Sequence, residues 1–175
     1  MAFDGVTIAA MVDELHKFLD GGRFNKIAQP EADELLITGK GALGQCRLLL
    51  SASASLPLIY FTEKNKVSPL TAPNFCMLLR KHIGSARIAD IRQPGLERVV
   101  EFELEHLNEL GDPCKKVLIM ELMGKHSNII FCDDKGMILD SIKHVSSHMS
   151  SVREVLPGRE YFIPQTQDKL DPLTV

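Results

Sequence analysis

A short polar segment at residues 95–98 carries side chains suited to recognising an anionic or a base-containing ligand. Glu97 and Arg98 place a carboxylate beside a guanidinium, directly after Gly95. A guanidinium makes planar, bidentate contacts to a phosphate or a base edge, and a neighbouring carboxylate can accept from a base amino group or orient the arginine. A local ion pair beside a turn is the alternative interpretation, and the residues leave both open.

A second polar segment, residues 121–128, lies between two apolar runs. It gathers a carboxylate, a cation, an imidazole and an amide around a glycine, in Glu121, Lys125, His126 and Asn128. Such a dense set of donors and acceptors suits an RNA backbone and single-stranded bases. The same residue types also occur in ordinary hairpin turns, so this interpretation stays open as well.

Basic residues cluster in the sequence ahead of an acidic block. The candidates for a basic face are Arg80, Lys81, Arg87 and Arg92, which precede Arg98, and the acidic residues that follow are Glu101, Glu103, Glu105, Glu109 and Asp112. A local basic face or a solvated surface of mixed charge would both give this pattern. The net charge of -3 and the pI near 6.1 argue against a protein that coats nucleic acid without specificity.

Other kinds of chemistry lack the residues that they need. His144 and His148 have a helical ligand spacing, but no glutamate lies between them as in a zinc-binding His-Glu-x-x-His motif. No Gly-x-Ser-x-Gly elbow presents a nucleophile. Residues 39–44 lack the Gly-Lys-Ser/Thr ending of a phosphate-binding loop, which favours a hairpin connection. We therefore expect no catalytic residue, no metal and no cofactor.

The composition is that of a soluble globular protein of one or two domains, with 175 residues, 45% hydrophobic and 25% charged. No stretch approaches the about 20 apolar residues of a membrane span, and no signal peptide is recognisable. These features predict a cytoplasmic protein without a membrane association. Cys46, Cys76, Cys114 and Cys132 form no Cys-x-x-Cys pair, and three of them lie in apolar runs, so we expect free thiols.

The elements that must position these segments follow from hydrophobic periodicity. Helical spacing predicts helices over residues 4–22 and 73–84. Short runs between turn residues predict antiparallel strands over 23–29, 34–38, 45–51, 58–61, 87–93, 98–106, 115–121, 127–132 and 137–144. The alternation breaks near Val100, which indicates either a bulge or a strand buried on both faces. From Ser146 the chain is rich in turn and linker residues.

Several blocks of the sequence are similar to the N-terminal domain of the NFACT family, the fibronectin-binding protein A, RqcH and NEMF type. The blocks are residues 3–5, 21–30, 73–82 with 86–88, 95–98, 121–130, and 156–158 with Tyr161. The resemblance implies an α+β fold, an antiparallel β-sandwich flanked by helices, similar to the N-terminal domain of formamidopyrimidine-DNA glycosylases. It further implies an NFACT-N domain over residues 1–160, with residues 161–175 starting a linker towards a helix-hairpin-helix region, a coiled coil and a second NFACT domain.

The resemblance also implies a function in ribosome rescue. Bacterial family members bind a stalled 50S subunit carrying peptidyl-tRNA, recruit tRNA, alanyl-tRNA in bacteria, and promote C-terminal alanine tailing of the nascent chain. The family's Asp-Arg pair, implicated in tRNA binding, corresponds to Glu97 and Arg98, with Glu in place of Asp. The family's Glu-Ile-Met-Gly-Arg-His-Ser-Asn block corresponds to residues 121–128, with Lys125 where Arg is common.

Two other activities are weighed against that expectation. Glycosylase chemistry does not follow from a related fold, because it uses an N-terminal proline followed by glutamate and this chain begins Met1-Ala2. The resemblance also brings a fibronectin-binding surface adhesin, which would require cell-surface exposure. The missing signal peptide and anchoring motif disfavour the adhesin, and the sequence favours a non-enzymatic RNA-binding module.

Overall fold

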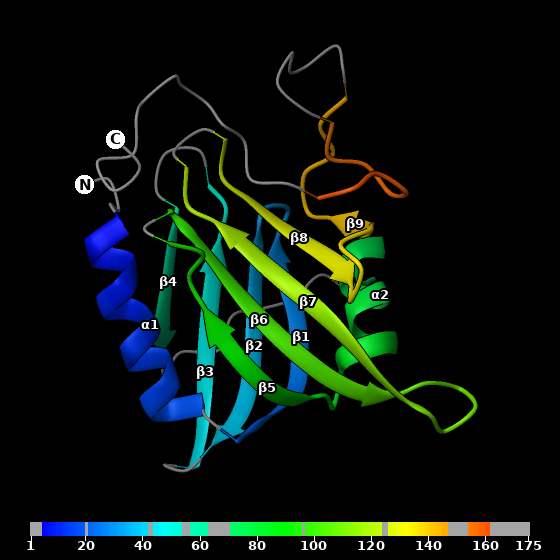
Figure 1. Ribbon diagram of the computed structural model, residues 1–175, viewed down its shortest axis with the longest axis horizontal. Helices are drawn as coiled ribbons and strands as arrows, with labels where there is room; N and C mark the ends of the chain where they lie inside the picture. Colours follow the sequence, from blue (N-terminus) through cyan, green and yellow to red (C-terminus); the bar gives the residue numbers. More distant parts are fainter. Residues whose placement is uncertain are drawn as a thin grey trace.

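A computed structural model describes residues 5–19, 21–41, 44–53, 57–62, 71–95, 97–123, 126–146 and 154–161 (Figure 1). The helices are α1 (Gly5–Leu19) and α2 (Asn74–Ile83), and the strands are β1 (Arg23–Glu31), β2 (Glu34–Gly41), β3 (Gly44–Ser51), β4 (Leu58–Thr62), β5 (Arg87–Arg92), β6 (Val99–Leu107), β7 (Pro113–Glu121), β8 (Asn128–Asp133) and β9 (Ile138–Ser141). Each predicted helix and strand is confirmed, with shifted ends.

The strands form one antiparallel sheet in the order β4-β3-β2-β1-β5-β6-β7-β8-β9. A single pair, Arg23 with Arg87, joins its two halves, and the sheet folds over there into a sandwich. The halves pack face to face around one apolar core, in which the rings of Phe24 and Phe102 lie 6.2 Å apart. The predicted α+β sandwich is confirmed.

The two helices lie on opposite sides of the sandwich (Figure 1). In α1 the buried residues Ile8, Val12, Leu15 and Leu19 recur every three or four positions, so one apolar stripe faces the core. Helix α2 packs on β1 and β6, and Arg80 Nε donates a hydrogen bond of 2.7 Å to the carbonyl of Ile27. Neither helix among the described residues is long and apolar enough to cross a membrane.

The central strands β6, β7 and β8 are covered on both faces. Val99 and Val100 are both fully buried although they point to opposite sides. Strand β6 pairs with β7 without a register shift, so burial on both faces, rather than a bulge against β7, explains the broken alternation. Residues 137–146 and 154–161 supply the second cover, with Ile138 and Val155 packed in one cluster with Val99. We call the surface under this cover the outer face.

Three of the shifted strand ends are informative. Strand β1 continues through Pro30, which was expected to end it, because the register with β2 shifts between Ala28 and Glu31 and releases Pro30 from the ladder. Strand β2 continues to Gly41, which pairs with Gly44. Strand β9 ends at Ser141 rather than at His144, where the Ser141 hydroxyl bends the chain by donating to the carbonyl of Lys143 at 2.7 Å.

The described residues of the turn-rich chain after Ser146 are packed on the domain. Gly158 N donates to Ile138 O, and Tyr161 N donates to Gly136 O, each at 2.8 Å. Among the described residues, packing continues to Tyr161, and the expected domain bounds of 1–160 stay a prediction. Residues 162–175 lie outside the described residues.

The four cysteines are free thiols, and burial raises the pKa of Cys132 to about 12.

Candidate functional site

The two polar segments singled out in the sequence lie side by side at one end of the sheet. Val99 pairs with Glu121, and Glu121 pairs with Asn128, so the chain entering β6 runs next to the connection from β7 to β8. Leu122 N donates to Arg98 O at 2.9 Å and joins them directly. We call residues 93–98 the first turn and residues 121–128 the second turn; Leu96, Gly124 and Lys125 are outside the described residues.

The first turn fixes its backbone and exposes its charged side chains. Gln93 Nε2 donates to Glu97 O at 2.7 Å, and Glu97 N donates to Pro94 O at 3.1 Å. Glu97 and Arg98 are both exposed. Neither side chain forms a hydrogen bond or an ion pair with another described residue, and the two do not pair with each other. The expected alternative of a Glu97–Arg98 ion pair is therefore not observed.

The second turn is closed by a buried hydroxyl. Ser127, only 1% exposed, accepts a hydrogen bond from Met123 N at 2.8 Å through its Oγ. His126 N donates to Met123 O at 3.0 Å, which leaves the His126 imidazole exposed. Among the predicted residues of this turn, His126 therefore joins Glu97 and Arg98 on the accessible surface, while Lys125 is not described.

Asn128, predicted to contact RNA, is buried and bonded within the protein. Its Nδ2 donates to Lys143 O at 2.9 Å, and its Oδ1 accepts from Lys143 N at 3.0 Å and from Ile129 N at 2.9 Å. Because Asn128 is only 2% exposed, its side chain is not accessible to a ligand. The expectation for Asn128 is corrected: its amide crosslinks the start of β8 to the chain after β9.

Glu121, the other acidic candidate, is fully buried on the outer face. Its Oε2 accepts a hydrogen bond of 2.8 Å from the hydroxyl of Tyr161. A buried carboxylate is tolerated only where hydrogen bonds or charges replace its water. The expectation for Glu121 is corrected in the same sense: it supports the second turn from beneath. Tyr161 was missed as a site residue because nothing in its local sequence links it to a strand 40 positions earlier.

The four residues predicted as a basic face lie on two elements and are largely engaged. Arg80 and Lys81 belong to α2, and Arg80 holds the backbone of β1 as described. Arg87 and Arg92 on β5 lie opposite the acidic block on β6, because the register pairs Arg87 with Glu105 and Arg92 with Glu101. These four side chains do not form an uncompensated basic surface with Arg98.

The ion pairs on β5 and β6 are short. Arg87 Nη2 lies 2.6 Å from Glu105 Oε2, and Arg92 Nε lies 2.9 Å from Glu101 Oε1. Glu103 and Asp90 are also within 4 Å of the Arg92 guanidinium. Burial alone would lower the pKa of Arg92, but the hydrogen bond to Glu101 and the surrounding carboxylates raise it above its ordinary value. The mixed-charge alternative therefore describes this surface.

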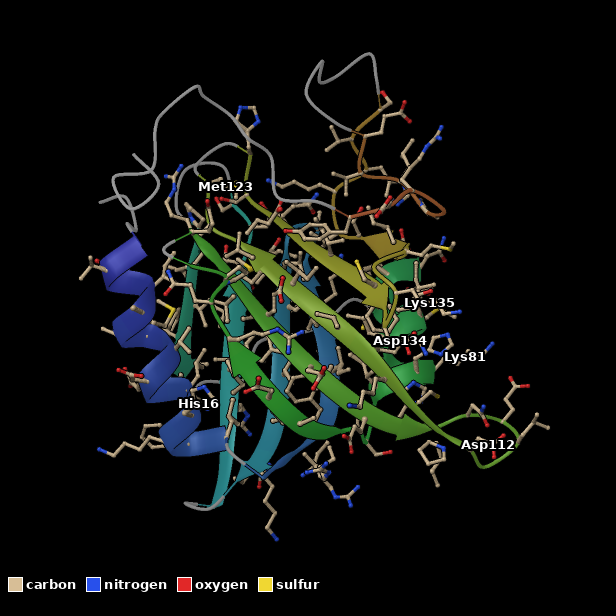
Figure 2. The ribbon with its side chains drawn as sticks, in the orientation of Figure 1. His16, Lys81, Asp112, Met123, Asp134 and Lys135 are labelled. Carbon is tan, nitrogen blue, oxygen red and sulfur yellow. The ribbon has the colours of Figure 1, made fainter. Side chains whose placement is uncertain are left out.

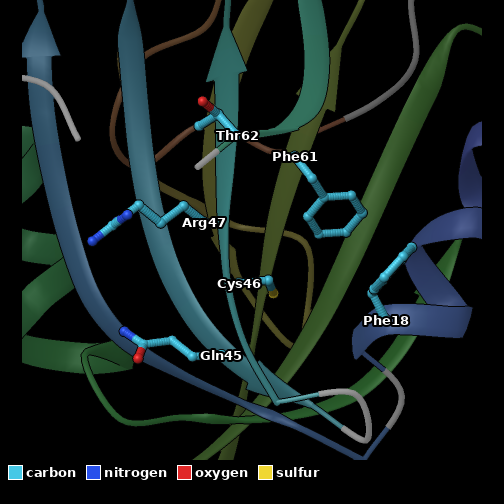
Figure 3. Close-up of a pocket in the computed structure, with 6 residues that line it drawn as sticks. All are labelled: Phe18, Gln45, Cys46, Arg47, Phe61 and Thr62. Atoms are coloured by element: carbon cyan, nitrogen blue, oxygen red, sulfur yellow. The ribbon is translucent and has the colours of Figure 1, made fainter. Parts of the chain in front are cut away.

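A cavity between the end of α1 and strands β3 and β4 carries no convergent chemistry. Figure 3 shows Phe18, Cys46 and Phe61 gathered on one side, while Gln45, Arg47 and Thr62 point away from them. Burial raises the pKa of Cys46, which favours the unreactive thiol. Among the described residues, no group of three or more His, Cys, Asp or Glu side chains is placed to hold a metal.

The sandwich and its two joined turns define a type of domain found in solved bacterial proteins. The crystal structure of the N-terminal domain of fibronectin-binding protein PavA from Streptococcus pneumoniae matches with a TM-score of 0.90 and 38% identity, covering 99% of this chain and 65% of that one. A likeness this close, over almost the whole chain, extends to the arrangement of the strands.

The family follows from the sequence comparisons. A family model described as NFACT N-terminal and middle domains matches residues 4–175, and the chain belongs to the NFACT family. The Rqc2 homolog RqcH of Bacillus subtilis is 41% identical over 174 residues, covering 99% of this chain and 30% of that protein. The ribosome quality control complex subunit NEMF of Mus musculus is 26% identical over 151 residues, 86% of this chain and 13% of that protein. The chain thus spans less than a third of either relative.

Proposed function

We propose that this domain binds tRNA and the large ribosomal subunit as part of a ribosome-associated quality control factor. The names of the relatives, RqcH and NEMF, support the process. The observation that carries the residue assignment is the contrast within the joined turns, where the backbone is fixed by internal hydrogen bonds and Glu97, Arg98 and His126 are exposed. Preorganised backbone with free polar side chains is what specific recognition of RNA requires.

Each exposed side chain has a distinct role in this proposal. Arg98 makes the planar contact to a phosphate or a base edge, and Glu97 accepts from a base amino group or orients the guanidinium. His126 stacks on a splayed base or donates to the backbone. Lys125, assigned from its sequence position, contacts a phosphate as a point charge. Glu121 and Asn128 act by holding the second turn, and we assign no catalytic residue.

The larger activity rests on the whole protein, of which this chain matches a part. We propose that the factor acts in the cytoplasm on 50S subunits carrying peptidyl-tRNA. There it would present alanyl-tRNA for C-terminal alanine tailing. Glu97 in place of the family's Asp keeps the charge on a longer side chain, so we expect tRNA recognition to be retained.

The test is tRNA binding by the purified 175-residue chain across a salt series. Arg98→Ala should weaken binding by roughly 10- to 100-fold at matched salt, because a guanidinium contact to a base or phosphate is lost. Arg23→Ala is the charge-matched control, since Arg23 is exposed on β1 and pairs with Arg87 at the start of β5, the end of that strand away from the first turn. Circular dichroism confirms folding. Equal affinities for Arg98→Ala and the unaltered chain would reject the assignment.

Fibronectin binding is the second candidate, favoured by the name of the solved relative PavA. An extended peptide binds by adding a strand to a sheet edge, and β4 ends the described sheet with Tyr60 45% exposed. The two candidates therefore predict different sensitive residues. Tyr60→Ser should weaken fibronectin capture and leave tRNA binding unchanged, whereas Arg98→Ala should do the reverse.

A further inference from the structure

The hydrogen bond between Tyr161 and Glu121 connects the candidate site to the segment where the described chain ends. We propose that Tyr161 is a positioning residue for RNA binding, acting through Glu121 to set the second turn. The inference rests on the proposed function and adds a residue to it that lies outside both turns.

Glu121 is the residue through which such an effect would pass. In the sheet it lies between Val99 and Asn128, so it contacts the strand that follows the first turn and the strand that follows the second. Leu122, its chain neighbour, donates the hydrogen bond to Arg98 O. A displacement of Glu121 therefore moves the attachment point of both turns together.

Tyr161 is itself held firmly enough to act as a fixed support. Its backbone N donates to Gly136 O at 2.8 Å, and the preceding residue Glu160 forms a bridge with Met137. The ring packs against the outer-face cluster that contains Val99 and Val155. Backbone contacts to the β8–β9 hairpin therefore hold Tyr161 in place, and the sheet holds Glu121. Both partners of the 2.8 Å hydrogen bond are thus fixed by other contacts.

Burial gives this bond its consequence. Glu121 is fully buried, so water does not readily replace a hydrogen bond that is withdrawn. Removing the hydroxyl from Tyr161 leaves the carboxylate with one hydrogen bond fewer in a low-dielectric surrounding. The carboxylate then loses one of the contacts that fix its position, and a shift of Glu121 alters the support of the second turn.

Coupling of this kind is reciprocal. If the bond favours the turn geometry that binds RNA, then RNA binding must stabilise the bond to the same degree. The Tyr161 phenol should consequently sense RNA although it lies beneath the site rather than on it. A purely structural tyrosine would affect folding stability without responding to RNA.

The chain offers a clean probe for this test, because it contains two tyrosines, Tyr60 and Tyr161. Protein grown with 3-fluorotyrosine should give two fluorine resonances, assigned with Tyr60→Phe. Titration with tRNA should shift the Tyr161 resonance along the same curve as direct binding and leave the Tyr60 resonance in place. In an Arg98→Ala background the shift should require correspondingly more tRNA.

The affinities complete the experiment. Tyr161→Phe should weaken tRNA binding about three- to tenfold, as the loss of one hydrogen bond predicts, while Tyr60→Phe binds as the unaltered chain does. Glu121→Gln keeps an acceptor for the phenol and should bind better than Glu121→Leu. The double variant Tyr161→Phe, Glu121→Leu should bind no worse than Glu121→Leu alone.

The outcomes separate this inference from the proposed function. Unaltered affinity in Tyr161→Phe with a stationary Tyr161 resonance, while Arg98→Ala still loses binding, overturns the role of Tyr161 and leaves the site intact. A Tyr161→Phe defect that appears only in thermal stability, with normal tRNA affinity below the melting transition, overturns it too. A chain that binds no tRNA in any form overturns both.

Discussion

Two asparagines at opposite ends of the β6–β8 part of the sheet use their side chains in the same way and in different surroundings. Asn128 Oδ1 accepts from Ile129 N and Lys143 N, and Asn108 Oδ1 accepts from Leu110 N and Asp112 N. Asn128 is buried behind the second turn, and Asn108 is exposed in the hairpin between β6 and β7. Met123 and Asp112, labelled in Figure 2, mark the two ends.

The difference between the two ends lies in the contacts that hold each turn, which are local in the β6–β7 hairpin and long-range in the second turn. The β6–β7 hairpin closes on itself: Asn108 bonds residues two and four positions ahead, and Leu110 at its tip is 86% exposed. The second turn is instead tied to distant segments, to Lys143 through Asn128 and to Tyr161 through Glu121. A turn held by long-range contacts on buried atoms keeps one geometry, which a binding surface needs and a free hairpin does not.

The largest expected effect is on stability at the buried end. Asn128→Ala removes three hydrogen bonds and leaves the backbone N–H of Lys143 without its acceptor, while the carbonyl of Lys143 keeps the Ser141 hydroxyl. We expect a loss of about 2–4 kcal/mol in the free energy of unfolding, because such groups are expensive to bury unsatisfied. Urea denaturation followed by circular dichroism measures it. A loss below about 1 kcal/mol would mean that water replaces the amide and that the end is less closed than described.

The matched change at the exposed end should have a smaller effect. Asn108→Ala deletes two hydrogen bonds to Leu110 N and Asp112 N, but both groups can turn to water. We expect a destabilisation of about 1 kcal/mol or less in the same urea experiment. Equal losses for Asn108→Ala and Asn128→Ala would break the comparison, since burial would then not decide the effect.

Much of this contrast follows from sequence and part of it does not. Helix α1 was predictable because its apolar residues recur at helical spacing, and the strands because short apolar runs alternate with turn residues. The exposure of Glu97 and Arg98 agrees with their place beside a glycine turn. The burial of Glu121 and Asn128 was not predictable, because polar side chains near a turn are usually exposed.

The missing information is long-range. The residues that bury Glu121 and Asn128 lie at Tyr161 and Lys143, and the carboxylates that neutralise Arg87 and Arg92 lie across the β5–β6 register. Periodicity within one strand reports which face is apolar, but it does not report which distant segment covers that face. From Ser146 the sequence shows turn and linker residues without periodicity, so it does not reveal that residues 154–161 cover the outer face.

A pH dependence belongs to the hairpin end, where His106 lies beside β7 and α2. Its Nε2 is 3.3 Å from Lys116 Nζ and 3.5 Å from Cys114 Sγ, and its ring lies 6.1 Å from that of His82. Burial, then the nearby Lys116, lowers the pKa of His82. Burial also lowers the pKa of His106. The hydrogen bond to Leu107 O acts in the opposite direction, and the charge of Lys116 lowers this pKa further. Lys81 and Glu109 also act on His82, with opposite signs.

The sign of the effect on stability follows from linkage. Each folded-state pKa lies below the ordinary 6.5, so the unfolded chain takes up protons first as the pH falls. The stability that the neutral His82 and His106 contribute is fully present above pH 6.5. It is lost as the pH falls below 6.5 towards the lower pKa values of the folded state. Unfolding midpoints between pH 7.5 and 5.5 should decline for the unaltered chain and decline less for His82→Gln, His106→Gln. An identical decline in that variant would assign the pH dependence to other groups.

The smallest expected effect is on RNA binding when the hairpin is shortened. Replacing residues 108–112 by Asn-Gly removes the exposed tip, including Leu110, and keeps a two-residue connection that suits antiparallel strands. At the rise of an extended strand, the length of β6 places the tip roughly 25–30 Å from Arg98. We therefore expect tRNA affinity to stay within about twofold. A larger loss, measured at the same salt as Arg98→Ala and with the fold intact, would mean that both ends of these strands contact RNA. The RNA-binding surface would then not be confined to the joined turns.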